Sequence, residues 1–320
     1  MNSTIHAENK KTSITIGIPT YNRPAALAVL LKKIAQTNIQ KHHLKVLVID
    51  DGSDAEEAKT LSLISENTYL KNSFCYLRNE INLGYPKTFI RLFNECKTDY
   101  LMIVTDDGDI FLEEGFQDAL KFLSTIPADL LSPQCMFGQK IYRGIKKTRP
   151  ITIEEFISCS NHAPGLIYNV DEARKHLNKL KDRLEQKCAF TFTYPQTVLC
   201  LHLLLAKRTC YWLNSATAGG GEGLPSGIKD PMGSGYWTYG SRLRQAASID
   251  DLLNSLEVSE DRDAAIKIAR LAYINWIYRT TDDETREAFK SLFTIKKQFR
   301  AAIGKCLPPR LKTFIKYFCN

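Results

Sequence analysis

The stretch Lys45-Val-Leu-Val-Ile-Asp-Asp-Gly-Ser-Asp54 decides the fold. Its short apolar run stops at two carboxylates, Asp50 and Asp51, which is typical of a buried parallel strand that carries polar side chains to the edge of an α/β sheet. The same pattern returns in Tyr100-Leu-Met-Ile-Val-Thr-Asp-Asp-Gly-Asp109. Open α/β sheets bind ligands at the carboxyl ends of their strands. Because clustered aspartates repel one another unless a cation lies between them, the pattern predicts Mg2+ or Mn2+ bridging to a phosphate.

Strand and helix patterns alternate around these two stretches. Strands are predicted over residues 13–18, 45–49, 74–77, 100–104 and 130–137. Helices are predicted over residues 24–36, 55–65, 87–95, 114–123 and 197–206. The alternation predicts a mainly parallel sheet with right-handed crossovers. It breaks up after about residue 127, and beyond the glycine-dense segment 218–240 the remainder of the chain is predicted to be helical.

Composition indicates a globular enzyme that does not span a membrane. The chain has 320 residues, and no run of about 18 apolar residues occurs in it. Residues 1–12 are polar, are expected to be flexible, and lack the apolar stretch of a signal peptide, so the cytoplasm is the expected compartment. Its 9 cysteines are scattered without a C-x-x-C pair, which favours reduced thiols over disulfides or a zinc site.

The positive charge is concentrated in the tail. Residues 288–320 contain no acidic residue, whereas the remainder of the chain has equal numbers of acidic and basic residues. The bases of the tail are Lys290, Lys296, Lys297, Arg300, Lys305, Arg310, Lys312 and Lys316. Apolar residues such as Phe314, Ile315 and Phe318 lie between them, which is typical of an interfacial amphipathic helix. An anionic membrane surface is one expected partner, and a helix pair packed on the body with a solvated basic face is the alternative.

Four motifs carry a resemblance to a known family. They are Ile16-Gly-Ile-Pro-Thr-Tyr-Asn-Arg23, Val48-Ile-Asp-Asp-Gly-Ser-Asp54, Arg78-Asn-Glu-Ile-Asn-Leu-Gly84 and Val104-Thr-Asp-Asp-Gly-Asp109. In this order and spacing they resemble family 2 glycosyltransferases of the GT-A fold, over about residues 13–125. Members of that family transfer a sugar from a nucleotide diphospho-sugar to an acceptor.

The resemblance implies an α/β GT-A fold with a mainly parallel central sheet and a C-terminal helical extension. Residues 13–125 would form the nucleotide-sugar-binding half, and residues 126–245 the acceptor-binding half with its glycine-rich loop. Residues 246–320 would form a helical region that ends in the basic tail.

The donor site is expected at the first-half motifs. The resemblance implies that the turn after the first strand and the Asp50-Asp51 pair hold the base and ribose, although a helix cap plus turn would also explain the pair. Lys87 and Arg91 add positive charge near the phosphates or lie on a solvated helix face. The expected donor ligands are Pro19, Thr20, Tyr21, Asn22, Arg23, Asp50, Asp51, Asn82, Gly84, Lys87, Asp106 and Asp107. Asp107 and Asp109, separated by a glycine, are the expected metal ligands.

The second half gives a weaker prediction. Most inverting relatives carry a Glu-Asp pair there, and this chain has Thr193-Tyr-Pro-Gln196 at a comparable place. The candidate bases are His162, Glu222 and Asp230, and if none acts, a retaining mechanism assisted by the leaving phosphate is the alternative. Aromatic faces suit sugar rings, so the expected acceptor residues are Tyr194, Tyr236, Trp237 and Tyr239, which would alternatively seal a lid against the core.

The sequence therefore predicts a metal-dependent glycosyltransferase at the cytoplasmic face of a membrane. Its acceptor would be a lipid-linked or growing cell-surface glycan, and no nucleic-acid partner is expected. A sugar nucleotidyltransferase would require a glycine-rich loop after the first strand, where this chain has Pro19 to Arg23. A non-catalytic sugar-nucleotide or glycan-binding protein is the other alternative, because the Glu-Asp pair is missing.

Overall fold

The computed structural model describes most of the chain, with interruptions. The described residues are 12–37, 44–66, 70–106, 109–137, 140–141, 145–220, 231–233, 235, 238–256, 263, 266–267 and 271. The chain divides into two compact units, Met1–Tyr236 and Trp237–Asn320. All described strands lie in the first unit, and the second contains the helix α10 (Tyr239–Asn254).

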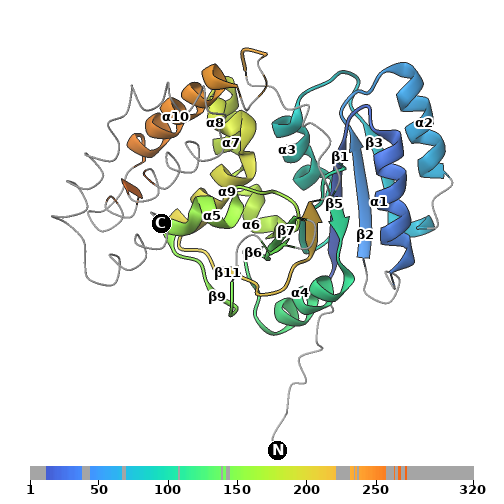
Figure 1. The fold of residues 1–320 in the computed structure, drawn as a ribbon, viewed down its shortest axis with the longest axis horizontal. Helices are drawn as coiled ribbons and strands as arrows, with labels where there is room; N and C mark the ends of the chain where they lie inside the picture. The colour runs from blue at the N-terminus through green and yellow to red at the C-terminus, as the bar shows by residue number, and fades with distance from the viewer. Residues whose placement is uncertain are drawn as a thin grey trace, which may run out of the picture. The chain divides into compact units, whose positions relative to one another are not determined.

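An eight-stranded sheet forms the centre of the first unit (Figure 1). Its order is β3-β2-β1-β4-β10-β6-β11-β9. The strands are β1 (Ile14–Thr20), β2 (Leu44–Asp50), β3 (Phe74–Arg78), β4 (Tyr100–Ile103), β6 (Leu130–Ser132), β9 (Arg149–Pro150), β10 (Ile167–Asn169) and β11 (Cys210–Trp212). The first four run parallel to one another, whereas β10 and β9 are antiparallel to their neighbours. The prediction of a mainly parallel sheet is confirmed.

The predicted strand over residues 130–137 is wrong in one respect, because it is two strands in two sheets. β6 joins the large sheet, and β7 (Cys135–Phe137) joins a four-stranded sheet of order β5-β12-β7-β8. The other strands of this sheet are β5 (Asp109–Phe111), β8 (Lys140–Ile141) and β12 (Ala218–Gly220). The break falls at Pro133, which has no N–H to donate to a neighbouring strand. The side-chain amide of Gln134 then donates to the carbonyl oxygens of Ile145 and Asn214.

The five predicted helices agree with α1, α2, α3, α4 and α9 to within two residues at either end, whereas α5 to α8 were not predicted. The longer ones are α1 (Pro24–Gln36), α2 (Ala55–Glu66), α3 (Tyr85–Glu95), α4 (Glu113–Thr125), α7 (Leu177–Glu185) and α9 (Pro195–Leu205). The shorter ones are α5 (Phe156–Ser160), α6 (Val170–Arg174) and α8 (Ala189–Thr193), with 3-10 turns at Lys71–Ser73 and Ile153–Glu155. Three of the helices, α1, α3 and α9, have proline in the first turn. Backbone N–H groups in the first turn form no hydrogen bond within the helix, so the missing N–H of proline costs nothing there. Within the described part of the chain, no helix combines the length and the hydrophobicity that crossing a membrane requires.

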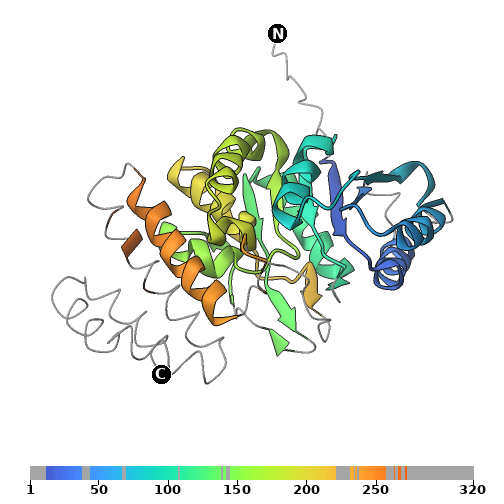
Figure 2. The same ribbon diagram turned by 90° about the horizontal axis from the view of Figure 1, so that it is seen from above.

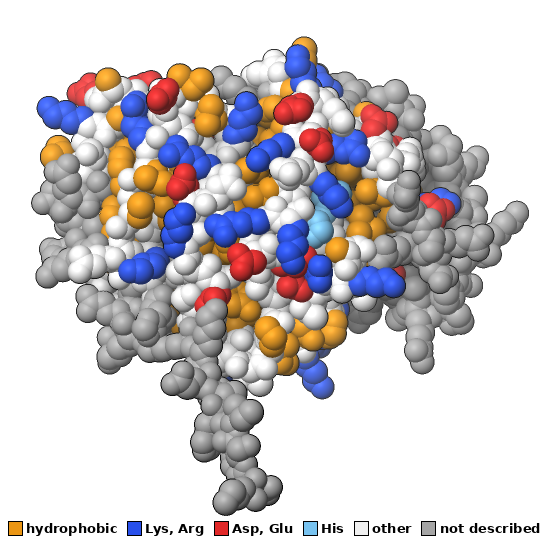
Figure 3. Space-filling model, turned by 180° about the vertical axis from the view of Figure 1, so that it is seen from behind, with side chains coloured by type: hydrophobic (Ala, Val, Ile, Leu, Met, Phe, Trp, Pro, Cys, Tyr) orange, Lys and Arg blue, Asp and Glu red, His pale blue; other side chains and the backbone are white. Residues whose placement is uncertain are grey.

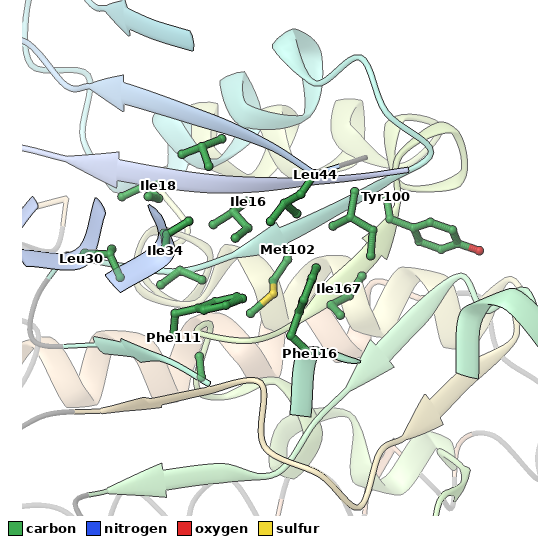
Figure 4. Close-up of a cluster of buried hydrophobic side chains, with 14 of the residues drawn as sticks. Ile16, Ile18, Leu30, Ile34, Leu44, Tyr100, Met102, Phe111, Phe116 and Ile167 are labelled. Atoms are coloured by element: carbon green, nitrogen blue, oxygen red, sulfur yellow. The ribbon is translucent and has the colours of Figure 1, made fainter. Parts of the chain in front are cut away.

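Helices lie on both faces of the large sheet (Figure 2), and buried apolar side chains fill the space between helices and sheet. On one face, side chains of β1, β4 and α1 meet those of β5 and α4, as Figure 4 shows for Ile16, Met102, Ile34, Phe111 and Phe116. On the other face, two phenylalanines of α3 pack edge-on against Tyr168 of β10, with ring centroids 6.4 and 5.4 Å apart. Because both faces are covered, the strands read as continuous apolar runs.

A buried histidine pair is expected to make the fold sensitive to acid. The rings of His176 and His202 are parallel, with centroids 6.3 Å apart. Burial, followed by the charges of Lys179, His176 and Arg183, lowers the pKa of His202 from 6.5 to about 3. The pKa of His176 is also lowered, by burial and Lys179, although Glu172 opposes this shift.

We therefore expect the free energy of unfolding to fall as the pH falls from about 6.5. In this range the unfolded chain binds a proton at residue 202 and the folded chain does not, so acid favours the unfolded state until the pH reaches about 3. Thermal unfolding at pH 7 and pH 5 measures the loss, and His202→Gln, which cannot be protonated, should lose less than the natural chain. Equal losses in both proteins would show that His202 does not cause the acid sensitivity.

Candidate active site

The carboxyl ends of the four parallel strands bring the first-half motifs to one edge of the sheet. Thr20, the last residue of β1, is in register with Asp50 of β2, and Asp50 is in register with Arg78 of β3. The backbone N–H of Asp51 donates to the Thr20 carbonyl oxygen at 2.8 Å. The Thr20 hydroxyl donates to Asp106 Oδ2 at 2.5 Å, just beyond the end of β4. Thr20 therefore links the two acidic segments that the sequence places at this edge.

Asp106 is a buried carboxylate beside an arginine. Arg23 Nη1 lies 3.9 Å from its Oδ1, while Oδ2 accepts from Thr20. The side chains of the neighbouring Asp107 and Asp109 lie outside the described residues. The backbone of Asp109 is described, and as the first residue of β5 it pairs with Gly220 of β12. The glycine-rich segment therefore begins beside the predicted metal-binding residues.

Asp50 is fully enclosed by protein donors. Its Oδ1 accepts from the backbone N–H and the hydroxyl of Ser53 at 3.0 and 2.5 Å. Its Oδ2 accepts from the Tyr76 hydroxyl at 2.9 Å and lies 3.2 Å from Arg78 Nε. The side chain is 0% exposed. Burial, followed by the hydrogen bond to Asp50, raises the pKa of the Tyr76 hydroxyl, which keeps it protonated as a donor. The geometry of Asp50 is therefore that of a structural turn.

Asp51 has a different environment from its neighbour. Both hydrogen bonds that the structure describes for its carboxylate end on Oδ1, from Asn79 Nδ2 at 2.6 Å and from the backbone N–H of Leu83 at 2.9 Å. The residue is 5% exposed. At Gly52, with φ +74°, an added Cβ would lie 2.4 Å from the carbonyl carbon of Ile81. This glycine lets the loop after β2 approach the loop after β3 and keeps Asp51 within reach of both donors.

The turn after β1 is fastened to the turn after β2. Asn22 has φ 53°, a conformation that asparagine tolerates better than most residues. Its side-chain amide donates to Asp54 Oδ2 at 2.9 Å and accepts from the Asp54 backbone N–H at 2.8 Å. Tyr21, beside it, is 40% exposed, so its ring is available to a ligand at this edge. Pro19 lies within β1, in register with Ile49.

The turn before α3 holds the remaining predicted donor residues. Asn82 Oδ1 accepts from the backbone N–H of Gly84 at 2.9 Å, which closes the turn. Gly84 has φ 83° and precedes the first turn of α3. Lys87 is exposed on that helix. Arg91 faces the protein instead, because its Nη1 donates to Asn79 Oδ1 and, at 3.0 Å, to the Arg78 carbonyl oxygen.

On the acceptor side, the structure describes His162 and Tyr194 among the predicted residues. His162 lies in the loop that leads into β10, and this loop borders the end of β4, where the N–H of Gly165 donates to the carbonyl oxygen of Ile103 at 2.7 Å. Tyr194 is buried and packs on Phe190, with ring centroids 5.4 Å apart. The other predicted acceptor and base residues have side chains outside the described residues, and so does the basic tail: Glu222, Asp230, Tyr236, Trp237, Tyr239 and residues 288–320.

The comparison with protein families decides the assignment. The description "Glycosyl transferase family 2" matches residues 15–189, which is more than half of the chain. The chain belongs to glycosyl transferase family 2. This glycosyltransferase has no match among curated proteins.

Solved structures share the fold of this glycosyltransferase at low sequence identity. TarS of S. aureus in complex with UDP-GlcNAc matches with a TM-score of 0.58 and 15% identity, covering 86% of this chain and 83% of that one. The mannosyltransferase PcManGT from Pyrobaculum calidifontis, in complex with GDP-Man and Mn2+, matches with a TM-score of 0.54 and 12% identity, covering 96% and 85%. The predicted fold class, GT-A, is confirmed, and the alternative of a sugar nucleotidyltransferase loses its support.

Three residues that hold the two aspartates at the end of β2 have no role predicted from the sequence. Tyr76 and Arg78 enclose Asp50, and Asn79 bonds Asp51. The signal that identified the aspartates, a polar residue at the carboxyl end of a parallel strand, applies equally to Arg78 and Asn79 at the end of β3. This sequence pattern does not predict which residue each side chain contacts, because the contacts depend on the register between β2 and β3.

Proposed function

We propose that this glycosyltransferase binds a nucleoside diphosphate sugar at the carboxyl ends of β1, β2 and β4 and transfers the sugar to a hydroxyl of a lipid-linked or growing cell-surface glycan. The observation that carries the proposal is the linkage of Asp51 and Asp106 through Thr20. It is supported by the family and by the nucleotide sugars in complex with TarS and PcManGT.

In this proposal Asp51, and not Asp50, recognises the nucleoside. An ionised carboxylate accepts hydrogen bonds only, so it suits an imide or amino N–H of a base or a ribose hydroxyl. Both oxygens of Asp50 already face protein donors, whereas the described bonds of Asp51 leave Oδ2 for the ligand. The exposed ring of Tyr21 would offer a face to the base. Pro19, Asn22, Arg23, Asn82, Gly84 and Lys87 remain proposed neighbours of the nucleotide.

Two isosteric variants distinguish the proposed role of Asp51 in binding from the structural role of Asp50. We expect Asp51→Asn to raise the dissociation constant of the donor about tenfold or more, since a charged hydrogen bond contributes about 1.5–3 kcal/mol. Asp50→Asn should instead lower the free energy of unfolding by about 1–3 kcal/mol, because Tyr76 and Arg78 lose a charged acceptor. Isothermal titration with UDP or GDP and thermal unfolding measure the two effects. Unchanged nucleotide affinity in Asp51→Asn would refute this role.

A divalent cation at Asp107 and Asp109 completes the proposed donor site. Carboxylate oxygens separated by one glycine suit Mg2+ or Mn2+, which prefer oxygen ligands. Among the residues whose side chains are described, no group of three His, Cys, Asp or Glu side chains could hold a metal ion. When bound, the cation would neutralise charge that develops on the leaving diphosphate. Arg23 near Asp106 supplies a further positive charge at the same edge.

The acceptor hydroxyl must lose its proton to a base or to the leaving phosphate. Gln196 lies in the first turn of α9, and its amide cannot act as a base. His162 is the candidate base whose loop borders the end of β4, and Glu222 and Asp230 remain candidates from sequence. Tyr236, Trp237 and Tyr239 remain the proposed acceptor-binding aromatics. Tyr194 is better explained by packing on Phe190.

Attachment to an anionic membrane through residues 288–320 is proposed on charge alone. Figure 3 shows one face of the described part, on which basic side chains are interspersed with acidic ones. This face therefore differs from the tail, whose charged side chains are all basic. Co-sedimentation of the full-length chain and of a chain ending at residue 289 with anionic vesicles would test the attachment.

A further inference from the structure

A chain of hydrogen bonds connects the helix α3 to the Asp51 carboxylate. Arg91 Nη1 donates to Asn79 Oδ1, and Asn79 Nδ2 donates to Asp51 Oδ1 at 2.6 Å. Asn79 Nδ2 also lies 3.1 Å from the hydroxyl oxygen of Thr88, one turn before Arg91 on α3. Asn79 and Asp51 are both buried, so the bonds between them are shielded from water.

We propose that Arg91 and Asn79 are positioning residues that hold the Asp51 carboxylate in place to bind the nucleoside. This inference rests on the proposed role of Asp51. Arg91 can only donate hydrogen bonds, and the Asp51 carboxylate can only accept them. An amide placed between the two has one favourable orientation, with its oxygen toward the guanidinium and its nitrogen toward the carboxylate.

The backbone holds this arrangement from a second direction. The N–H of Asn79 donates to the Asp50 carbonyl oxygen at 2.8 Å, and the N–H of Leu83 donates to Asp51 Oδ1 at 2.9 Å. Two donors on the same oxygen fix the rotation of the carboxylate, so that Oδ2 is the oxygen presented to a ligand.

Without Arg91, the oxygen of the Asn79 amide loses the side-chain donor that it faces, so the orientation of the amide is less strongly fixed. A rotated amide would place its oxygen against the Asp51 carboxylate, and the carboxylate would then turn away or lose a donor. The cost would appear in nucleoside binding, because binding would have to restore the carboxylate orientation. A preformed orientation avoids this cost.

A double-mutant cycle tests the connection. The variants are Arg91→Gln, which is a good helix former and too short to reach both acceptors, Asn79→Ala, and the pair together. The probes are UDP, GDP, ADP, CDP and dTDP, titrated with Mn2+, and the tightest-binding one is used for all variants. We expect Arg91→Gln alone to raise the dissociation constant about fivefold. In the Asn79→Ala background the same substitution should change it by less than about twofold, because no amide is left to orient.

Arg174 provides the matched control. It lies on α6 and donates to the carbonyl oxygens of Phe93 and Cys96 at the carboxyl end of α3, the end opposite Gly84. Arg174→Gln removes an arginine that fastens the same helix without touching Asn79. Thermal unfolding should show a loss of stability in this variant, with nucleotide affinity unchanged.

The outcomes separate the two proposals. If none of the five nucleotides binds the natural chain, the proposed function fails and this inference with it. If a nucleotide binds but Arg91→Gln binds it equally well, or weakens it equally with and without Asn79, only the positioning role is overturned. Weakening of nucleotide binding by Arg174→Gln to the same extent would also overturn it, because the effect would then be one of helix stability. If Asn79→Ala does not fold, Asn79→Ser takes its place in the cycle with the same expectation.

Discussion

Replacing Asp109 by alanine is expected to lower the rate of sugar transfer about a hundredfold or more. In the proposed function this carboxylate, with Asp107, holds the cation that neutralises charge on the leaving diphosphate. Its position supports the prediction, because Asp109 follows the buried Asp106 by three residues and opens β5, whose backbone pairs with the glycines of β12. Without metal, the variant should be at least as stable as the natural chain, since removing one of several aspartates that are close in sequence relieves repulsion.

The measurement needs a control for the loss of any nearby carboxylate. Glu114 is exposed in the first turn of α4, five residues after Asp109, and Glu114→Ala should retain transfer. Initial rates with Mn2+ and with chelator, together with titration of UDP or GDP in both conditions, measure the metal effect. Full activity of Asp109→Ala in chelator, equal to that of the natural chain with Mn2+, would show that the cation is not part of the reaction.

Replacing Gly115 by alanine is expected to lower the free energy of unfolding by about 3 kcal/mol or more. A Cβ at this position would lie 1.8 Å from the carbonyl oxygen of Ala216 and 2.4 Å from its carbonyl carbon. The obstacle is backbone and cannot rotate away. By helix propensity alone, alanine would raise the free energy of unfolding by about 1 kcal/mol. A lower free energy of unfolding therefore indicates steric overlap, and a higher one indicates that helix propensity dominates.

The steric overlap at Gly115 should also disturb the strands packed beside α4. The segment before β12 is fastened to α4 and β5, where the N–H of Leu112 donates to the Thr217 carbonyl oxygen at 3.0 Å and the Ser215 hydroxyl donates to Asp118. Displacing Ala216 would therefore disturb the pairing of β12 with β5 and β7. Thermal or denaturant unfolding measures the change, with Glu114→Ala as the exposed control in the same helical turn. A stability equal to that of the control would refute the steric argument.

The first half of the fold could be predicted because the hydrophobic pattern within each helix or strand is enough to identify it. Apolar runs such as Val46 to Ile49 are buried on both faces and end at carboxylates, and α1 carries Leu27, Leu30, Leu31 and Ile34 on one side. The second half could not be predicted in the same detail. Its strands are two or three residues long, and a segment such as β10 is placed by pairing with strands far away in sequence.

The candidate site shows the same division. The rule that polar residues at strand ends face the ligand edge identified Asp50 and Asp51 together, but it could not distinguish them. The distinction comes from β3, because Tyr76 and Arg78 lie beside Asp50 and Asn79 reaches Asp51. Tyr194 shows a second limit of sequence patterns. Its aromatic ring made it a predicted acceptor residue, but the sequence does not tell whether the ring is exposed or, as in the structure, packed on Phe190.

The antiparallel strand β10 has a consequence for how the chain is made. It lies between β4 and β6, so one edge of β4 is covered by residues 167–169, which leave the ribosome long after β4 itself. Until then the nascent chain carries an unpaired strand edge, which is a template for pairing with other chains. A fragment that stops before β10 would keep that edge permanently. The segment from β1 to β4 is therefore not expected to fold correctly when it is moved alone into another protein, and a chimera that exchanges it between family members must carry a β10 that matches the new β4.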